Sequence, residues 1–102
     1  MKKTEIRDAL LEQLRAQRKN PAFYTDLVND YMDYWEIKRK LIKDIKEKGV
    51  RYTVTNGNGI ATEKPNESIM NLNKTTATML KILADLNLKE PTKVDNDTDD
   101  YL

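Results

Sequence analysis

Apolar side chains recur every three to four residues in three stretches of the chain, which is the spacing of amphipathic helices. The first stretch predicts a helix from about residue 5 to residue 18, with Thr4 as its expected cap. Asn20-Pro21 ends this pattern, because the residue before a proline avoids helical geometry. The apolar positions of the first helix share one face: Ile6, Leu10, Leu11 and Leu14.

A second helix is predicted from Pro21, with Asn20 as its cap, to Lys48, where Gly49 suits the left-handed stop position. Its apolar stripe is about 140° wide at 100° per residue, wider than a single neighbouring helix covers. The protein therefore needs more than one packing partner along this helix. The stripe holds Tyr24, Leu27, Val28, Tyr31, Tyr34, Trp35, Leu41, Ile42 and Ile45.

The pattern changes between residues 50 and 64. Val50 to Thr55 alternates as a strand does, Asn56-Gly57-Asn58-Gly59 is typical of a turn, and Ile60-Ala61-Thr62 follows, so a short β-hairpin is expected. A third helix is predicted from Pro65-Asn66-Glu67 to near Leu88. Its positions have coiled-coil spacing: Ile69, Leu72, Thr76, Met79, Leu83 and Leu86.

These elements predict an all-α fold, a long antiparallel helical hairpin with a short N-terminal helix and a small β-hairpin-like excursion. We divide the chain into a basic N-terminal helix (1–20), a helical oligomerisation core (21–91, with the excursion at 50–64) and a disordered acidic tail (92–102). The tail has no helical periodicity and carries Asp95, Asp97, Asp99 and Asp100. Apolar residues make up only 38% of the chain, so we expect the long helices to complete their core against other copies of the chain or against a partner.

Composition excludes most catalytic chemistry. The chain has no cysteine and no histidine, so it has neither thiolate ligands nor the usual general base. Asn56-Gly57-Asn58-Gly59 lacks the lysine and helix start of a phosphate loop, and the alternating aspartates of the tail lack the glycine and glutamate of a calcium loop. No apolar run is long enough to span a membrane. We expect no enzyme activity, no cofactor and no metal.

Charge is unevenly distributed although the net charge is only +1. Residues 1–20 hold six basic and three acidic side chains, residues 38–51 hold seven and two, and residues 90–102 hold one and five. A solvated helix face explains such clusters in a lone subunit, but repetition around an oligomer would suit duplex DNA. The predicted DNA-binding residues are Lys2, Lys3, Arg7, Arg15, Arg18, Lys19, Lys38, Arg39, Lys40, Lys43, Lys46 and Lys48. The N-terminal cluster is favoured, because subunit packing is expected to occupy part of the second helix.

Aromatic residues of the second helix have two interpretations. Aromatics near basic residues can stack on single-stranded nucleic acid, but at helical spacing they more often form a core or a subunit interface. We favour the interface because aliphatic residues share the same face. The predicted interface residues are Tyr24, Leu27, Val28, Tyr31, Tyr34, Trp35, Ile42, Met79, Leu83 and Leu86.

The order of these elements resembles the small subunit of tailed-phage terminases over roughly residues 10–92. The resemblance is carried by Tyr31-Met32-Asp33-Tyr34-Trp35, by Ile45 to Gly49, by Lys64-Pro65-Asn66 and by Leu83 to Pro91. Many relatives end the last helix with Leu-Gly-Leu, and here Asn87 replaces the glycine. Many also have a helix-turn-helix head, for which residues 1–20 are too few, so contact with phosphates is expected rather than reading of bases.

This resemblance implies a ring-forming, non-catalytic protein that binds double-stranded viral DNA at packaging initiation. It implies two further partners, the large ATPase-nuclease subunit and other copies of the chain, and a place of action in the cytoplasm of the infected bacterial host. The alternative is a helical or coiled-coil scaffold that binds no nucleic acid. Salt-dependent DNA binding would distinguish the two.

Overall fold

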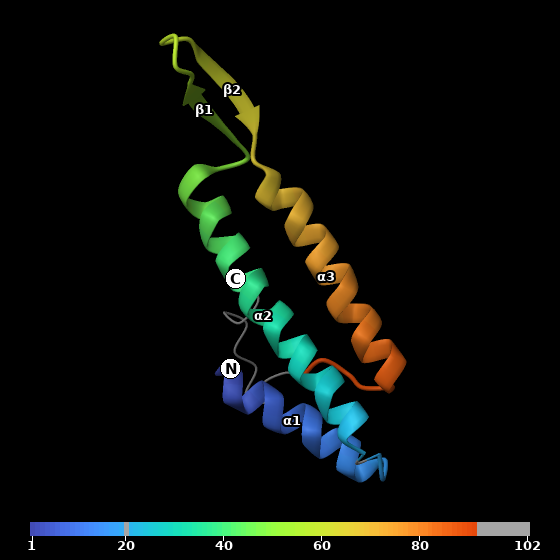
Figure 1. Ribbon diagram of the computed structural model, residues 1–102. Helices are drawn as coiled ribbons and strands as arrows, with labels where there is room; N and C mark the ends of the chain where they lie inside the picture. The colour runs from blue at the N-terminus through green and yellow to red at the C-terminus, as the bar shows by residue number, and fades with distance from the viewer. Residues whose placement is uncertain (20, 92–102) are drawn as a thin grey trace.

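A computed structural model of the chain describes residues 1–19 and 21–91, which form three helices and one β-hairpin (Figure 1). Helix α1 spans Lys3–Ala16, α2 spans Ala22–Lys48 and α3 spans Glu67–Leu86. Between α2 and α3, strands β1 (Arg51–Thr55) and β2 (Ala61–Pro65) pair antiparallel, with Thr53 opposite Glu63. The expected helical hairpin with an N-terminal helix and a β excursion is confirmed.

The predicted starts of the first two helices differ from the structure. Thr4 lies inside the first turn of α1, which begins at Lys3 after Lys2, and the Lys2 side chain makes no capping hydrogen bond. Pro21 is the residue before α2 rather than its first helical residue. The other expected cap, Asn20, lies outside the described residues. Because Pro21 has no backbone N–H, one fewer donor at the start of α2 needs a hydrogen-bond acceptor.

Helices α2 and α3 end close to the predicted residues, and a residue with positive φ follows each helix. Gly49 follows α2 with φ of 79°, and its N–H donates to the carbonyl of Ile45 at 2.7 Å. Asn87 follows α3 in the left-handed conformation, with φ of 55°, and Leu88 N–H donates to Leu83 O at 2.8 Å. Asparagine therefore supplies the turn that glycine usually makes at such a helix end.

The core lies at one end of the helical hairpin, where α1 packs across α2 and α3 (Figure 1). Among the described residues of α2, none after Met32 is buried, and in α3 none before Thr75 is. We call the part with α1 the proximal half and the part beside the β-hairpin (33–48 and 67–74) the distal half. The buried apolar residues are Ile6, Leu10, Leu14, Val28, Tyr31, Met32, Met79, Leu83, Leu86 and Leu88.

Two glutamines of α1 hold the segment that follows α3. The Gln13 amide donates to Lys89 O at 2.8 Å and accepts from Lys89 N–H at 2.9 Å, as a paired strand would. Gln17 donates to Asn87 O at 2.7 Å. Burial, together with the charge of Glu90, raises the pKa of Tyr31 to about 12, so this core phenol stays neutral near pH 7. The segment after α3 therefore belongs to the proximal core.

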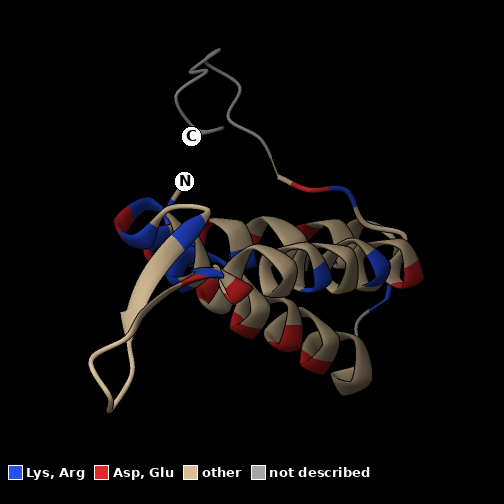
Figure 2. Ribbon diagram, turned by 90° about the horizontal axis from the view of Figure 1, so that it is seen from above, with Lys and Arg blue, Asp and Glu red and all other residues tan. Residues whose placement is uncertain are grey.

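Helix α2 is acidic in its first half and basic in its second half. From Ala22 to Ile37 its charged residues are Asp26, Asp30, Asp33 and Glu36, whereas Lys and Arg outnumber Asp and Glu from Lys38 onward. Figure 2 shows red segments following one another along the first half and blue ones gathering at the other end. Among the described helices, none is long and apolar enough to cross a membrane.

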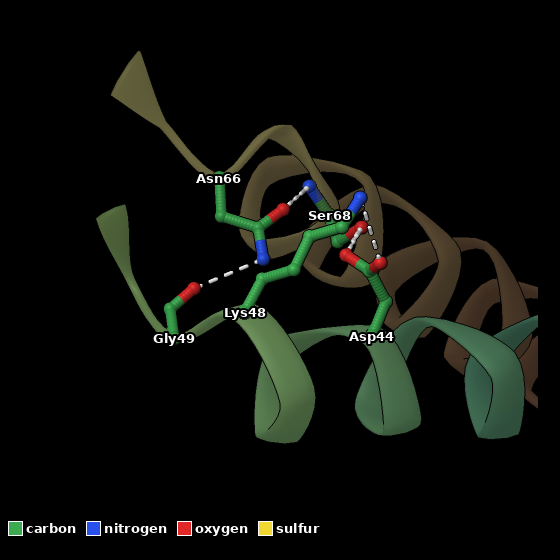
Figure 3. Close-up of polar contacts among 5 residues, drawn as sticks. All are labelled: Asp44, Lys48, Gly49, Asn66 and Ser68. Carbon is green, nitrogen blue, oxygen red and sulfur yellow. Dashed lines mark hydrogen bonds and ion pairs between the residues drawn. The ribbon is translucent and has the colours of Figure 1, made fainter. Parts of the chain in front are cut away.

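A group of polar contacts closes the hairpin where α2, β1 and α3 meet (Figure 3). Asn66, only 6% exposed, caps α3 by accepting from Ser68 N–H at 3.0 Å, and its side-chain amide donates to Gly49 O at 2.9 Å. Its own N–H donates to Val50 O at 2.8 Å. Such a cap contributes about 0.5–2 kcal/mol to stability. Asn66 therefore fixes the start of α3 relative to the end of α2.

Asp44 completes this junction from α2. Ser68 Oγ donates to Asp44 Oδ2 at 2.7 Å, and Lys48 Nζ lies 3.2 Å from Asp44 Oδ1. The hydrogen bond from Ser68, and after it the contact with Lys48, lowers the pKa of Asp44 below its usual value. A lowered folded-state pKa stabilises the fold above the ordinary carboxyl pKa, and that stabilisation is lost as the pH falls through the lowered pKa.

We predict that Ser68→Ala raises the pKa of Asp44 toward the usual aspartate value and lowers the urea midpoint at pH 7. The stability difference from wild type should narrow below about pH 4, where carboxylates become protonated. Carboxyl NMR titration and urea unfolding at both pH values measure these effects. Thr78→Ala is the matched control, because the Thr78 hydroxyl donates to the Lys74 carbonyl of its own helix. An unchanged Asp44 titration in Ser68→Ala would contradict the assignment.

Candidate nucleic-acid interface

The basic residues of α1 do not form one patch. Lys2 and Lys3 lie at its start, where Lys3 Nζ is 2.6 Å from Glu36 Oε1 in the middle of α2. Arg15 is twelve residues further on, about 18 Å along the helix at 1.5 Å per residue. Arg18, which has a positive φ of 59°, and Lys19 follow the end of the helix. The predicted N-terminal cluster is therefore split between the two ends of α1.

Several of these side chains already have partners within the subunit. Arg7 Nε donates to Asn29 Oδ1 at 3.0 Å, Arg15 lies 3.2 Å from Glu12, and the Lys19 ammonium lies 5.9 Å from the centre of the Tyr24 ring. Arg15 and Glu12 are both exposed, and an exposed pair of this kind contributes little to stability. Arg15 could exchange its partner for a phosphate at small cost.

The second half of α2 carries a denser set of basic residues. Arg39, Lys43 and Lys46 are spaced four and three residues apart, so they share one face of the helix, and all three are exposed. The Arg39 guanidinium lies 4.7 Å from the centre of the Trp35 ring, which holds it in place by a cation–π contact. Two other residues of the predicted DNA-binding set are not simply exposed on this face: Lys38 is half-buried, and Lys48 contacts Asp44 and the Tyr52 ring.

Glu36 joins the start of α1 to this basic face. Its pKa is lowered first by the hydrogen bond from Lys3 and by the Lys3 charge, and further by the charge of Lys40, so both lysines lie beside it. The start of α1 therefore borders the second half of α2. We call the resulting surface the basic strip. It consists of Lys2, Lys3, Arg39, Lys40, Lys43 and Lys46.

The predicted interface residues fall into two groups. Val28, Tyr31, Met79, Leu83 and Leu86 are buried in the subunit's own core. The others are partly covered: Tyr24, Leu27, Tyr34 and Trp35 pack against that core, and Ile42 is half-buried in the distal half. The surface open to another copy thus includes residues that the apolar periodicity did not single out. Phe23, Ile37, Met70 and Leu80 are the exposed large apolar side chains of α2 and α3, at 66%, 44%, 63% and 56%.

An elongated helical protein with one basic strip and an incompletely covered helix pair belongs to the class of binding proteins. Comparison with known families is more specific. The family described as phage terminase, small subunit, matches residues 4–93, and the chain belongs to this family. No curated protein and no solved structure matches the chain significantly.

Family membership settles the general role. Terminase small subunits are non-catalytic proteins of DNA recognition and regulation, which agrees with the expectation that the chain is not an enzyme. The family implies a role in phage DNA packaging within the infected host, in partnership with phage DNA and the large terminase subunit.

Proposed function

We propose that this subunit binds phage DNA at packaging initiation through the basic strip, mainly by contacts with phosphates. The observation that carries the proposal is the placement of Arg39, Lys43 and Lys46 on one exposed face of α2, beside the start of α1. From Lys3 to Lys46 the strip follows about 15 Å of α2, and duplex DNA carries one charge per ~1.7 Å of its axis. Several phosphates therefore lie within reach of each subunit.

Phosphate contact also suits the shape of the helices. In a helix-turn-helix a second, recognition helix lies in the major groove, and the first helix crosses the backbone. Here α1 is held against α2 and the segment after α3 by its buried leucines and by Gln13, so it is not a separate reading head. The subunit would thus contact DNA with little preference for sequence, and repetition in an oligomer would supply affinity.

The proposal includes a homo-oligomer, for which a closed ring is the expected form. Ile37, Leu41, Ile42 and Ile45 of α2 and Ile69 and Leu72 of α3 remain half-buried or exposed in the distal half. An antiparallel pair of helices covers only one side of each helix, and a further layer is needed to bury the rest. A neighbouring copy would supply that layer, in place of the α1 that covers the proximal half.

We predict that Arg39→Ala/Lys43→Ala/Lys46→Ala weakens binding to all duplex sequences alike. In a plot of the logarithm of its DNA affinity against the logarithm of the salt concentration, the negative slope should become less steep by about 0.9 for each phosphate that the variant no longer neutralises. Fluorescence titration at several salt concentrations measures both effects. Arg15→Ala/Arg18→Ala/Lys19→Ala removes the same charge from the other end of α1 and should change the slope less.

Two results would contradict the DNA proposal. If the wild-type protein binds no duplex at low salt, the subunit has no direct DNA role, and the scaffold alternative is favoured. If the control variant loses as much affinity as the strip variant, the basic strip is not the contact surface. The solution mass of each variant should be measured beside wild type, so that a change in assembly is not mistaken for a change in DNA contact.

Recruitment of the large subunit is assigned to residues 92–102, which lie outside the described residues. Their sequence carries four aspartates, and its negative charge would be repelled by DNA. A partner other than DNA is therefore the better match for this segment.

We predict that deleting residues 93–102 abolishes capture of the large subunit but preserves solution mass and DNA affinity. Pull-down with purified large subunit, light scattering and DNA titration measure the three properties. A control with all four aspartates changed to asparagine keeps the length of the segment and tests its charge. Unchanged capture by the truncated protein would exclude this assignment.

A further inference from the structure

Helix α3 carries a second apolar stripe on its outer side. Met70, Asn73, Ala77, Leu80 and Ala84 are spaced three, four, three and four residues apart, and all are exposed. This is the spacing of a coiled-coil seam, and the two alanines allow another helix to approach closely. The stripe contains no charged residue, but Lys74 and Lys81 border it and are also exposed.

Helix α2 carries a stripe of the same spacing and the opposite charge. Phe23, Asp26, Asp30, Asp33 and Ile37 are also three, four, three and four residues apart, and all are exposed. Both stripes cover fifteen residues, whose first and last members are about 21 Å apart along the helix. Within the described part of the chain, the three aspartates of this acidic stripe have no ion-pair partner, and neither do Lys74 and Lys81.

The two stripes lie on separate sides of one subunit. Counted at 100° per residue, the α3 stripe lies about 145° around its helix from the buried side chains, and the α2 stripe lies about 170° from those of its own helix. Pairing two acidic stripes would bring aspartates together, and pairing two α3 stripes antiparallel would bring Lys74 near Lys81 of the other copy. Contact between an α2 stripe and an α3 stripe is therefore more favourable than contact between two stripes of the same kind, and this favours head-to-tail assembly.

The register within the hairpin places the charges at matching heights. Ser68 contacts Asp44, and thirteen residues further along α3 and back along α2 lie Lys81 and Tyr31. If a parallel copy stands beside the first, Lys81 is thus level with the region between Asp30 and Asp33 of that copy. Lys74 and Lys81 are seven residues apart, as are Asp26 and Asp33, so an axial shift of five residues, about 7.5 Å, pairs both lysines.

We infer that the acidic stripe of α2 is the docking surface for the outer stripe of α3 in a second copy of this chain. Leu80 and Met70 then pack beside Phe23 and Ile37, and the lysines that border one stripe face the aspartates of the other. This inference rests on the homo-oligomer proposed above and gives its contacts a direction. Each subunit offers one surface of each kind, so each subunit binds one neighbour through α2 and another through α3.

Two charge-reversed proteins test the inference. Asp26→Lys/Asp30→Lys/Asp33→Lys makes both surfaces basic, and Lys74→Glu/Lys81→Glu makes both acidic. Each protein alone should associate about tenfold more weakly than wild type or worse, because like charges face each other across the contact. An equimolar mixture should regain the wild-type solution mass, since every contact then joins opposite charges. Sedimentation velocity measures the masses, and circular dichroism checks that each variant is folded.

The control carries the same change in charge elsewhere. Glu5→Lys/Asp8→Lys/Glu12→Lys reverses three exposed acids of α1 and should assemble as wild type does. If both reversed proteins keep the wild-type mass, or if mixing them restores nothing, the inference is overturned while the proposed oligomer stands. A wild-type protein that is monomeric at every concentration tested would remove the oligomer itself, and this inference with it.

Discussion

The packing of α1 across one end of the α2–α3 hairpin is the contact on which the rest of the structure depends. Leu10 and Leu14 are almost fully buried there, and Gln13 holds the segment that follows α3. Because α1 has 14 residues and α2 has 27, this third layer ends near the middle of the hairpin. Within residues 1–19 and 21–91, no third layer covers the other half of α2 and α3, and the Asn66–Asp44 junction closes its far end.

This unequal coverage connects the fold to the proposed function. Helix α1 begins beside Glu36, and its first lysines there border the basic half of α2, so the edge of the core is also the beginning of the basic strip. The distal half keeps its apolar side chains available to another copy. Binding of DNA and assembly therefore use different parts of α2: Arg39, Lys43 and Lys46 in its second half, and the stripe from Phe23 to Ile37 in its first half.

The elements were predictable because their signals are local, whereas the site depends on contacts that sequence spacing does not report. Apolar periodicity, Pro21 and Gly49 placed the long helices within a few residues. Periodicity alone did not show that Leu83 would be buried within the subunit and Leu80 left outside, because α3 is apolar on both sides. A second three-four series through Met70 and Leu80 was the available signal. The split of the N-terminal basic cluster follows from the length of α1, which separates Lys3 from Arg15.

Amide hydrogen exchange at a series of protein concentrations tests whether another copy completes the distal half. Exchange reports local opening, and poorly covered helices open most easily. We expect amides of residues 38–48 and 67–74 to exchange more slowly as the subunits associate, while those of residues 28–32 and 79–86 are already protected in the isolated subunit. Equal protection of both halves in the isolated subunit, unchanged on association, would contradict this expectation.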